Sequence, residues 1–235
     1  MDIKIYQGNK LKLPQSDINV VIDVIRAFTF AHIAFLRNAK KIILSSNKSD
    51  CFVIRKKYKN LVLAGEEQGI RIKGFDYGNS PASIINENFQ NKILVQKTTN
   101  GVNAALNSLN ADKVITTGLT NVSNTIKYIK NHLISYNENA KVNIIASHPS
   151  SDEDYAVAEY IKSALMNENK INAVQVVQRI LKSDAAQKFL DTSKEQFDYK
   201  DLEICTNEIN GEEFVMLVNI SANVPFIERI NLYDS

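Results

Sequence analysis

Short apolar runs of strand length alternate with runs of helical length along most of this chain, and this alternation constrains the fold more than any other feature. The strand-like runs are 19–25, 41–46, 60–66, 91–99, 112–118 and 141–147, and the runs that read as helices are 27–39, 48–58, 101–109, 121–134 and 151–166. Such alternation is typical of a mostly parallel sheet with helices on both faces. The sequence therefore predicts an α/β fold with three layers, α/β/α, around a mostly parallel or mixed sheet.

The C-terminal part of the chain departs from this alternation. The runs 201–206 and 211–219 both read as strands, with Asn210 and Gly211 near a turn. We therefore expect antiparallel edge strands within 200–235. No long linker, repeat or low-complexity segment is evident, and 235 residues are enough for one large α/β domain, so we expect a single domain over 1–235.

Composition argues against several classes of protein. The net charge of +2 gives no strong field for nucleic acid or for an anionic membrane. No apolar run approaches the length of a membrane span, and the first residues lack the apolar core of a signal peptide. Cys51 and Cys205 are too few for a disulfide framework or a zinc site. We expect a cytoplasmic protein with reduced thiols that binds neither nucleic acid nor a membrane.

Polar residues recur where the predicted strands end. In open α/β sheets the ligand lies outside the carboxyl ends of the strands, at helix N-termini. Most of these residues are also ordinary caps and turn formers. Asp23 and Arg26 are different, because an ionisable pair at the end of an apolar run is costly unless it is paired or functional. The other polar residues at predicted strand ends include Glu66, Glu67, Thr98, Thr99, Asn100, Gly101, Thr117, Asn121, Ser147, His148, Glu153 and Asp154.

The stretch "GFDYGNSPASI", from Gly74 to Ile84, combines turn formers with a helix start. Ser80 can cap a helix and Pro81 suits its first position. A helix start does not explain Asp76 and Asn79, which could present oxygen atoms to a metal. Mg²⁺ prefers hard oxygen ligands together with water and phosphate. The carboxylates that permit such a site are Asp23, Glu66, Asp76, Glu153 and Asp154.

Several familiar catalytic motifs are absent. The sequence contains no G-x-x-x-x-G-K-[ST], no G-x-G-x-x-G and no G-x-S-x-G, which argues against nucleotide binding through those loops and against a serine hydrolase of that type. His32 lies inside an apolar helical run, so we expect a structural role for it. His148 stands at a strand end, which leaves a catalytic role open.

Five stretches occur together in one order: "VVIDVIRAFT", "LAGEEQGIRIKGFDYGNSP", "TTNGVNA", "TGLTN" and "SSDEDYAVAEYI". Together they resemble the 2-phosphosulfolactate phosphatase family over 19–165. The resemblance implies a three-layer α/β fold and a Mg²⁺-dependent phosphomonoesterase, whose named reaction converts 2-phospho-3-sulfolactate to 3-sulfolactate and phosphate. We therefore expect a Mg²⁺-dependent phosphatase that acts on a small phosphorylated organic acid. A homodimer is one assembly that such a chain could form.

The resemblance also assigns roles to individual residues. Whether Asp23 is a nucleophile, a base or a metal ligand stays open, although the absence of D-x-D-x-T argues against an aspartyl-phosphate. The catalytic residues implied are Asp23, Arg26 and Asp76. The substrate-binding residues implied are Asn79, Ser80, Thr98, Thr99, Asn100, Gly101 and Asn121. The metal ligands implied are Asp23, Glu66, Glu153 and Asp154.

Two positions depart from the family pattern. Glu67 and Asn103 stand where the family usually has arginine. Each lost charged hydrogen bond to an anionic substrate costs about 1.5–3 kcal/mol of binding. Lys97 or Arg71 could compensate in part. The alternative to an active phosphatase is a catalytically degenerate homologue that keeps the fold and binds a metal, a metabolite or a protein partner.

Overall fold

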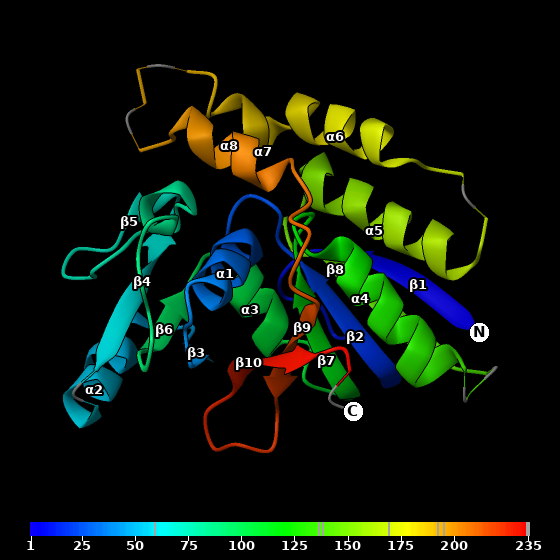
Figure 1. The fold of residues 1–235 in the computed structure, drawn as a ribbon, viewed down its shortest axis with the longest axis horizontal. Helices are drawn as coiled ribbons and strands as arrows, with labels where there is room; N and C mark the ends of the chain where they lie inside the picture. The colour runs from blue at the N-terminus through cyan, green and yellow to red at the C-terminus, as the bar shows by residue number, and fades with distance from the viewer. Residues whose placement is uncertain are drawn as a thin grey trace.

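The computed structural model describes residues 1–233 except 59, 136, 138, 169, 192 and 195. An α/β fold is confirmed (Figure 1). The strands within the described residues are β1 (Asp2–Gln7), β2 (Ser16–Ile22), β3 (Lys41–Leu44), β4 (Leu61–Glu67), β5 (Ile70–Arg71), β6 (Ile93–Lys97), β7 (Ala111–Thr117), β8 (Lys141–Ala146), β9 (Phe214–Asn219) and β10 (Phe226–Asn231).

The helices match the predicted helical runs as far as α5. They are α1 (Ala27–Leu36), α2 (Lys48–Lys57), α3 (Gly101–Leu106), α4 (Val122–Ile129), α5 (Asp152–Leu165), α6 (Ala173–Lys182), α7 (Asp184–Gln187) and α8 (Tyr199–Cys205). A 3₁₀ turn, η1 (Ala82–Ile84), follows Pro81, and a π-helical turn, η2 (Lys130–Ile134), extends α4. No helix among the described residues is long and apolar enough to cross a membrane.

All ten strands of the described residues form one mixed sheet in the order β1-β8-β2-β7-β9-β10-β3-β6-β4-β5. The sheet contains two parallel blocks, β1-β8-β2-β7 and β3-β6-β4. The hairpin β9-β10 joins the blocks, because β9 pairs antiparallel with β7 and β10 pairs antiparallel with β3. The prediction of a mixed sheet is therefore confirmed.

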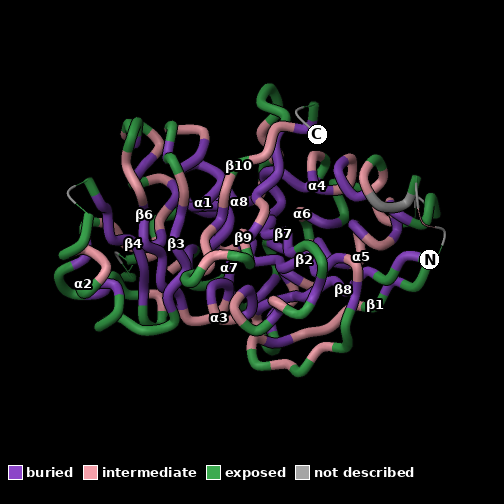
Figure 2. Tube along the Cα trace, turned by 90° about the horizontal axis from the view of Figure 1, so that it is seen from below, coloured by how far each residue is buried: buried purple, intermediate pink, exposed green. Residues whose placement is uncertain are grey.

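Helices cover both faces of the sheet, and adjacent strand residues show which helix lies on which face. Ile42 of β3 packs in the cluster that includes α1 and α3, whereas Ile43 packs with α2. In the same way Phe214 of β9 faces α1, and Val215 faces α4 and α5. The buried residues lie along the central strands and along the helices that pack on them, above all α1 (Figure 2). The three layers are thus α1 and α3, the sheet, and α2, α4 and α5.

The prediction for the C-terminal part was wrong in two respects. Residues 201–206 do not form a strand, because Asp198 caps a helix there by accepting a hydrogen bond from the Lys200 amide, and α8 follows. The strands β9 and β10 do not lie at an edge but in the middle of the sheet. Their position explains why Phe214 is fully buried.

The carboxyl ends of both parallel blocks meet at one end of the molecule. The hairpin β9-β10 reverses the strand direction between the blocks, but the twist of the sheet turns β2 and β4 until both run toward the region beneath α7 and α8 (Figure 1). Helix α6 packs against α5, and the chain then crosses these strand ends through α7 and α8. Side chains from distant strands are thereby brought into one pocket.

His32 of α1 is a fully buried histidine, in agreement with the structural role expected for it. Its Nδ1 lies 3.0 Å from the hydroxyl of Thr120, and its ring packs against Phe214. Burial, with a smaller effect of the charge on Arg229, lowers the pKa of His32 to about 3. Because the unfolded chain binds a proton at this site below pH 6.5 and the folded chain does not, stability falls as the pH falls from 6.5 toward 3.

We therefore expect His32→Asn to weaken the loss of stability in acid. Asn can keep the hydrogen bond to Thr120 but does not titrate, so about 3 kcal/mol of the decrease in unfolding free energy between pH 6.5 and 4 should disappear. The measurement is denaturant unfolding across this pH range. Thr120→Val is the control, since it removes the hydrogen bond and keeps the histidine. An equal pH slope in the wild type and His32→Asn would contradict the prediction.

Candidate active site

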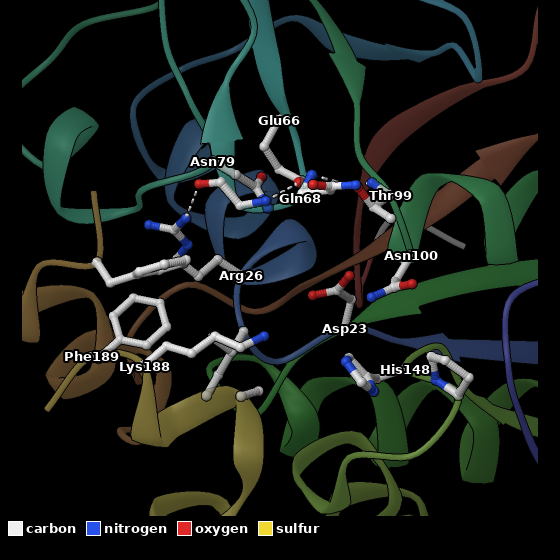
Figure 3. Close-up of a pocket in the computed structure, with 15 residues that line it drawn as sticks. Asp23, Arg26, Glu66, Gln68, Asn79, Thr99, Asn100, His148, Lys188 and Phe189 are labelled. Carbon is white, nitrogen blue, oxygen red and sulfur yellow. Dashed lines mark hydrogen bonds between the residues drawn. The ribbon is translucent and has the colours of Figure 1, made fainter. Parts of the chain in front are cut away.

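A pocket of about 350 Å³ lies at the carboxyl ends of the strands (Figure 3). Both parallel blocks and the segment around α7 contribute to it. Its lining residues are Asp23, Ile25, Arg26, Glu66, Gln68, Gly69, Asn79, Thr99, Asn100, His148, Pro149, Ala185, Lys188, Phe189 and Phe197. The predicted site residues that line it are therefore Asp23, Arg26, Glu66, Asn79, Thr99 and Asn100.

Asp23 follows β2 and is 5% exposed. Its Oδ1 accepts a hydrogen bond of 2.8 Å from the Ala27 amide at the start of α1, and the Ser147 hydroxyl donates to its Oδ2 at 3.4 Å. Gly101 packs directly on this carboxylate, because a Cβ at Gly101 would lie 2.5 Å from Asp23 Oδ2 and 2.8 Å from the Cβ of Ala27. The glycine of the T-T-N-G turn is thus required by the close approach of α3 to Asp23.

Burial raises the pKa of Asp23 to about 7. The Ala27 amide lowers this pKa, the negative charges of Glu66 and Glu153 raise it further, and the Gly101 amide again lowers it. The Asp23 carboxyl therefore lies in an acidic environment in which its negative charge is not compensated.

Glu66 is the last residue but one of β4, and its carboxylate is held by three hydrogen bonds. Its Oε1 accepts from the Thr99 amide at 2.6 Å, and its Oε2 accepts from the Gly69 amide at 2.6 Å and from the Thr99 hydroxyl at 3.1 Å. Glu66 thereby joins the end of β4 to the turn after β6. The Thr99 amide, which the sequence suggested for substrate, is already occupied by this carboxylate.

Arg26 is buried, and its guanidinium is held from several sides. Its Nη1 donates to Asp201 of α8 at 2.7 Å, and its Nη2 donates to the Gly69 carbonyl at 3.2 Å. The guanidinium also lies 5.0 Å from the ring centroid of Phe189 and 5.5 Å from that of Phe197. Asp201 is fully buried, so this ion pair fixes Arg26 in the wall of the pocket.

Ser80 does not line the pocket but supports this ion pair. Its hydroxyl donates to Asp201 at 2.6 Å, and the Ala82 amide donates to the same oxygen at 3.0 Å. Asn79, one residue earlier, does line the pocket, and its Oδ1 accepts a weak hydrogen bond of 3.4 Å from Gln96. The N-S-P motif therefore places one amide in the pocket and ties the turn to α8.

Asp76 lies outside the pocket, so the structure does not support a direct catalytic role for it. Its carboxylate pairs with Arg55 of α2 at 2.9 Å and accepts from the Leu63 amide at 2.8 Å. It holds the loop after β5 against β4.

Three other predicted residues also lie outside the pocket. The Thr98 hydroxyl accepts from the Val102 amide and supports the start of α3. The side-chain oxygen of Asn121 accepts from Thr117 and from the Gly118 amide. Gly101 contacts Asp23 from behind. These residues shape the turns around the pocket.

The four carboxylates predicted as metal ligands do not form one ligand set. Asp23 and Glu66 line the pocket, whereas Glu153 and Asp154 lie behind it at the start of α5. Asp154 accepts from the amides of Val24 and His148, and burial, followed by the charges of Glu153 and Asp23, raises its pKa well above its ordinary value. Across the described residues, no group of three or more Asp, Glu, His or Cys side chains is arranged to hold a metal ion.

The two departures from the family pattern also lie outside the pocket. Glu67 is half exposed and pairs with Lys97 at 3.3 Å and with Lys48 at 3.7 Å. The side-chain amide of Asn103 donates to the Thr99 carbonyl at 2.9 Å, which stabilises the turn before α3. Lys97 is thus engaged by Glu67, and it does not compensate for a missing arginine in the pocket.

The structure adds pocket residues to which the sequence assigned no role. Lys188, Phe189 and Phe197 come from the segment between α7 and α8, where no motif was evident. His148 was identified at a strand end and does line the pocket. Its Nδ1 accepts from the Ser151 amide at 2.9 Å, so in the neutral ring the proton is on Nε2.

Comparison with known proteins shows the family of this chain. A model of the family described as 2-phosphosulpholactate phosphatase matches residues 5–235. This chain belongs to that family. A relative from Bacillus subtilis (strain 168), named "Probable 2-phosphosulfolactate phosphatase", is 45% identical over 98% of this chain and 99% of its own length. Relatives with the same name from Thermoplasma volcanium and Carboxydothermus hydrogenoformans are 31% and 28% identical, over 86% and 98% of this chain and 90% and 89% of their own lengths.

The resemblance to the 2-phosphosulfolactate phosphatase family, inferred over 19–165, is therefore confirmed and extends across the C-terminal segment. This extension includes Lys188, Phe189, Phe197 and Asp201. The names of the relatives describe a phosphoric monoester hydrolase, in agreement with the prediction of an enzyme.

Removing one partner of the buried Arg26–Asp201 pair should strongly destabilise this region. We expect Asp201→Ala to lower the free energy of unfolding by about 3–5 kcal/mol, because it leaves a buried guanidinium without its counter-charge. Asp198→Ala is the matched control: it removes the cap of the same helix and should cost only about 0.5–2 kcal/mol. Denaturant unfolding of both variants measures the difference. Equal losses would mean that α8, and not the ion pair, accounts for the effect.

Proposed function

We propose that this protein is a Mg²⁺-dependent phosphatase that hydrolyses 2-phosphosulfolactate, or a related phosphorylated hydroxy acid, to the alcohol and phosphate. One observation carries the proposal: in a member of this phosphatase family, the buried Asp23 and Arg26 share a pocket at the carboxyl ends of the strands. The pocket volume of about 350 Å³ suits a small substrate.

The donor atoms of the pocket fit Mg²⁺. This ion is usually bound by one or two carboxylates, with water and substrate phosphate completing its shell. Asp23 and Glu66 supply two carboxylates, and the side chain of Asn79 supplies an amide oxygen, whereas the side-chain oxygen of Asn100 already accepts from Asn9 at 2.6 Å. The raised pKa of Asp23 agrees with this fit, because burial and then the charges of Glu66 and Glu153 disfavour its negative charge, which a bound cation would offset. Asp23 and Glu66 would hold the ion, which supplies positive charge to the phosphoryl oxygens when bound.

The remaining polar groups of the pocket can bind and orient the phosphoryl group. Arg26 makes three hydrogen bonds, to Asp201, Gly69 and Gln196. Two of its N–H donors have no hydrogen-bond partner among the described residues and are available to an oxyanion. His148 carries a proton on Nε2 in its neutral form and can donate it within the pocket.

The main argument for a catalytically degenerate homologue is weaker once the positions of Glu67 and Asn103 are known. That alternative was based on the loss of arginine at Glu67 and Asn103. Neither residue lines the pocket, and both have structural partners, Lys97 for Glu67 and the Thr99 carbonyl for Asn103. The two substitutions therefore leave the pocket residues in place.

We expect the purified protein to release phosphate from 2-phosphosulfolactate in the presence of Mg²⁺ and not in the presence of a chelator. Asp23→Asn should lower kcat/KM by about a hundredfold or more, because it removes the central carboxylate of the pocket. Asp76→Asn is the matched control, since Asp76 lies outside the pocket, and it should keep activity within a few-fold.

Phosphate release that is indifferent to chelator would refute the metal dependence. Equal losses in Asp23→Asn and Asp76→Asn would refute the assignment of the pocket. No release from 2-phosphosulfolactate or from any other phosphorylated hydroxy acid, by protein with a normal unfolding transition, would refute the proposed function.

Binding of Mg²⁺ can be tested without substrate. We expect Mg²⁺ at ten times its dissociation constant to stabilise the wild-type protein by about 1.4 kcal/mol, through linkage of binding to folding. Asp23→Asn should lose most of the stabilisation by Mg²⁺, whereas Asp76→Asn should keep it. Thermal unfolding with and without Mg²⁺, and calorimetric titration of the ion, are the measurements. Identical responses in all three proteins would exclude Asp23 as a ligand.

A further inference from the structure

The pocket has two chemically different walls. One wall carries the carboxylates and amides that follow the strands, among them Asp23, Glu66 and Asn100. The other wall comes from the segment after α7 together with Arg26, and it combines cationic and aromatic side chains (Figure 3). A substrate with two acidic groups can therefore contact both walls at once.

Lys188 is a cation of this second wall whose amine is not engaged. The positive charge of Arg26 is compensated by Asp201 at 2.7 Å. Lys188 has no ion-pair or hydrogen-bond partner among the described residues, although it lines the pocket. Figure 3 shows its side chain extending across the pocket, with the amine toward Asp23 and His148.

The backbone around Lys188 is fixed by contacts on both sides. Before it, the Ala185 amide donates to the Ser151 hydroxyl at 3.2 Å, which ties α7 to the start of α5. After it, Phe189 packs on Phe197 with ring centroids 5.1 Å apart and beneath the Arg26 guanidinium. The lysine stem is therefore anchored over the pocket, while its flexible end is free to meet a ligand.

The chemistry of the proposed substrate calls for such a group. After the phosphoryl group is bound near Asp23 and Arg26, 2-phosphosulfolactate still presents a carboxylate and a sulfonate. An ammonium on a flexible stem binds either anion as a point charge. Lys188 is exposed, so its ammonium can reach a ligand from solvent, and the apolar side chains of Ile25 and Phe189 line the pocket beside it.

We propose that Lys188 binds the second acidic group of the substrate and so makes the enzyme prefer phosphorylated hydroxy acids over simple phosphate monoesters. This inference rests on the proposed function. In this proposal the second wall recognises the acidic group of the substrate, whereas the first wall and Arg26 take part in the reaction at phosphorus.

The test compares three substrates in the full-length protein with Mg²⁺. They are 2-phosphosulfolactate, 2-phospholactate, which lacks the sulfonate, and glycerol 2-phosphate, which lacks both acids. Lys188→Ala should lower kcat/KM for 2-phosphosulfolactate about 10- to 100-fold, mainly through a higher KM. Lys188→Ala should change kcat/KM for glycerol 2-phosphate by no more than about threefold. Lys188→Arg keeps the positive charge, so it should keep most of the wild-type kcat/KM for 2-phosphosulfolactate. If Lys188→Ala also lowers kcat/KM for 2-phospholactate, Lys188 binds the carboxylate. If kcat/KM for 2-phospholactate is unchanged, Lys188 binds the sulfonate.

Lys182→Ala is the matched control. Lys182 is an exposed lysine at the end of α6 and does not line the pocket, so its removal should change none of the three values. Equal losses for all substrates in Lys188→Ala would overturn the proposal, because they would show a contact with the phosphoryl group or a structural role. Unchanged kinetics for every substrate would also overturn it.

A binding experiment separates this proposal from the proposed function. If the wild-type protein releases no phosphate, the proposed function fails, but Lys188 can still be tested by calorimetric titration with 3-sulfolactate. A dissociation constant at least about tenfold weaker in Lys188→Ala than in the wild type and Lys182→Ala would support the acid-binding role. Equal dissociation constants, or no binding to the wild type, would overturn it.

Discussion

The buried ion pair between Arg26 and Asp201 is the interaction on which the pocket depends. Asp201 lies 175 residues after Arg26, and its other oxygen accepts from Ser80 and from the Ala82 amide. One carboxylate thus joins the loop after β2, the turn η1 and helix α8. Because removing two charges from water costs about as much as their attraction returns, such a pair contributes more to one defined arrangement than to stability. It holds the aromatic wall of Phe189 and Phe197 over the strand ends.

This pairing also determines the charge that remains in the pocket. Burial, and then the charges of Glu66 and Glu153, raise the pKa of Asp23. Because Asp201 compensates Arg26, the carboxylates around Asp23 keep an excess of negative charge. A cation that enters with the substrate would compensate this excess. Lys188, on the opposite wall, has no partner within the described part of the chain and attracts an anion. This distribution of charge is the reason why we propose a metal ion at the first wall and a second acidic group of the substrate at the other.

Sequence periodicity was sufficient for β2 to β4, for β6 to β8 and for the helices as far as α5, because these strands are largely buried on both faces. It missed β1 and the two-residue β5, which lie at the edges of the sheet and are less buried. It failed where local pattern and tertiary structure disagree. Residues 201–206 have the apolar content of a strand, but the cap at Asp198 begins a helix that packs Leu202 and Cys205 inward. The central position of β9 and β10 depends on pairing with β7 and β3, which are distant in sequence. No local signal distinguishes an edge strand from one inserted between two parallel blocks.

The same distinction applies to the site. From their positions at strand ends, Asp23, Arg26 and Glu66 were expected near one another, and they do line one pocket. The strand ends hold these residues in place and meet in the same region of the molecule. Position at a strand end did not give the direction of each side chain: Asp76 turns back to β4, and Asp154 turns to the amides behind the pocket. Lys188 follows a short helix whose place depends on contacts of its neighbours with α5 and Arg26. In this fold the strand ends carry the residues found in the sequence motifs, whereas a segment positioned by long-range packing supplies the wall to which we assign the second acidic group of the substrate.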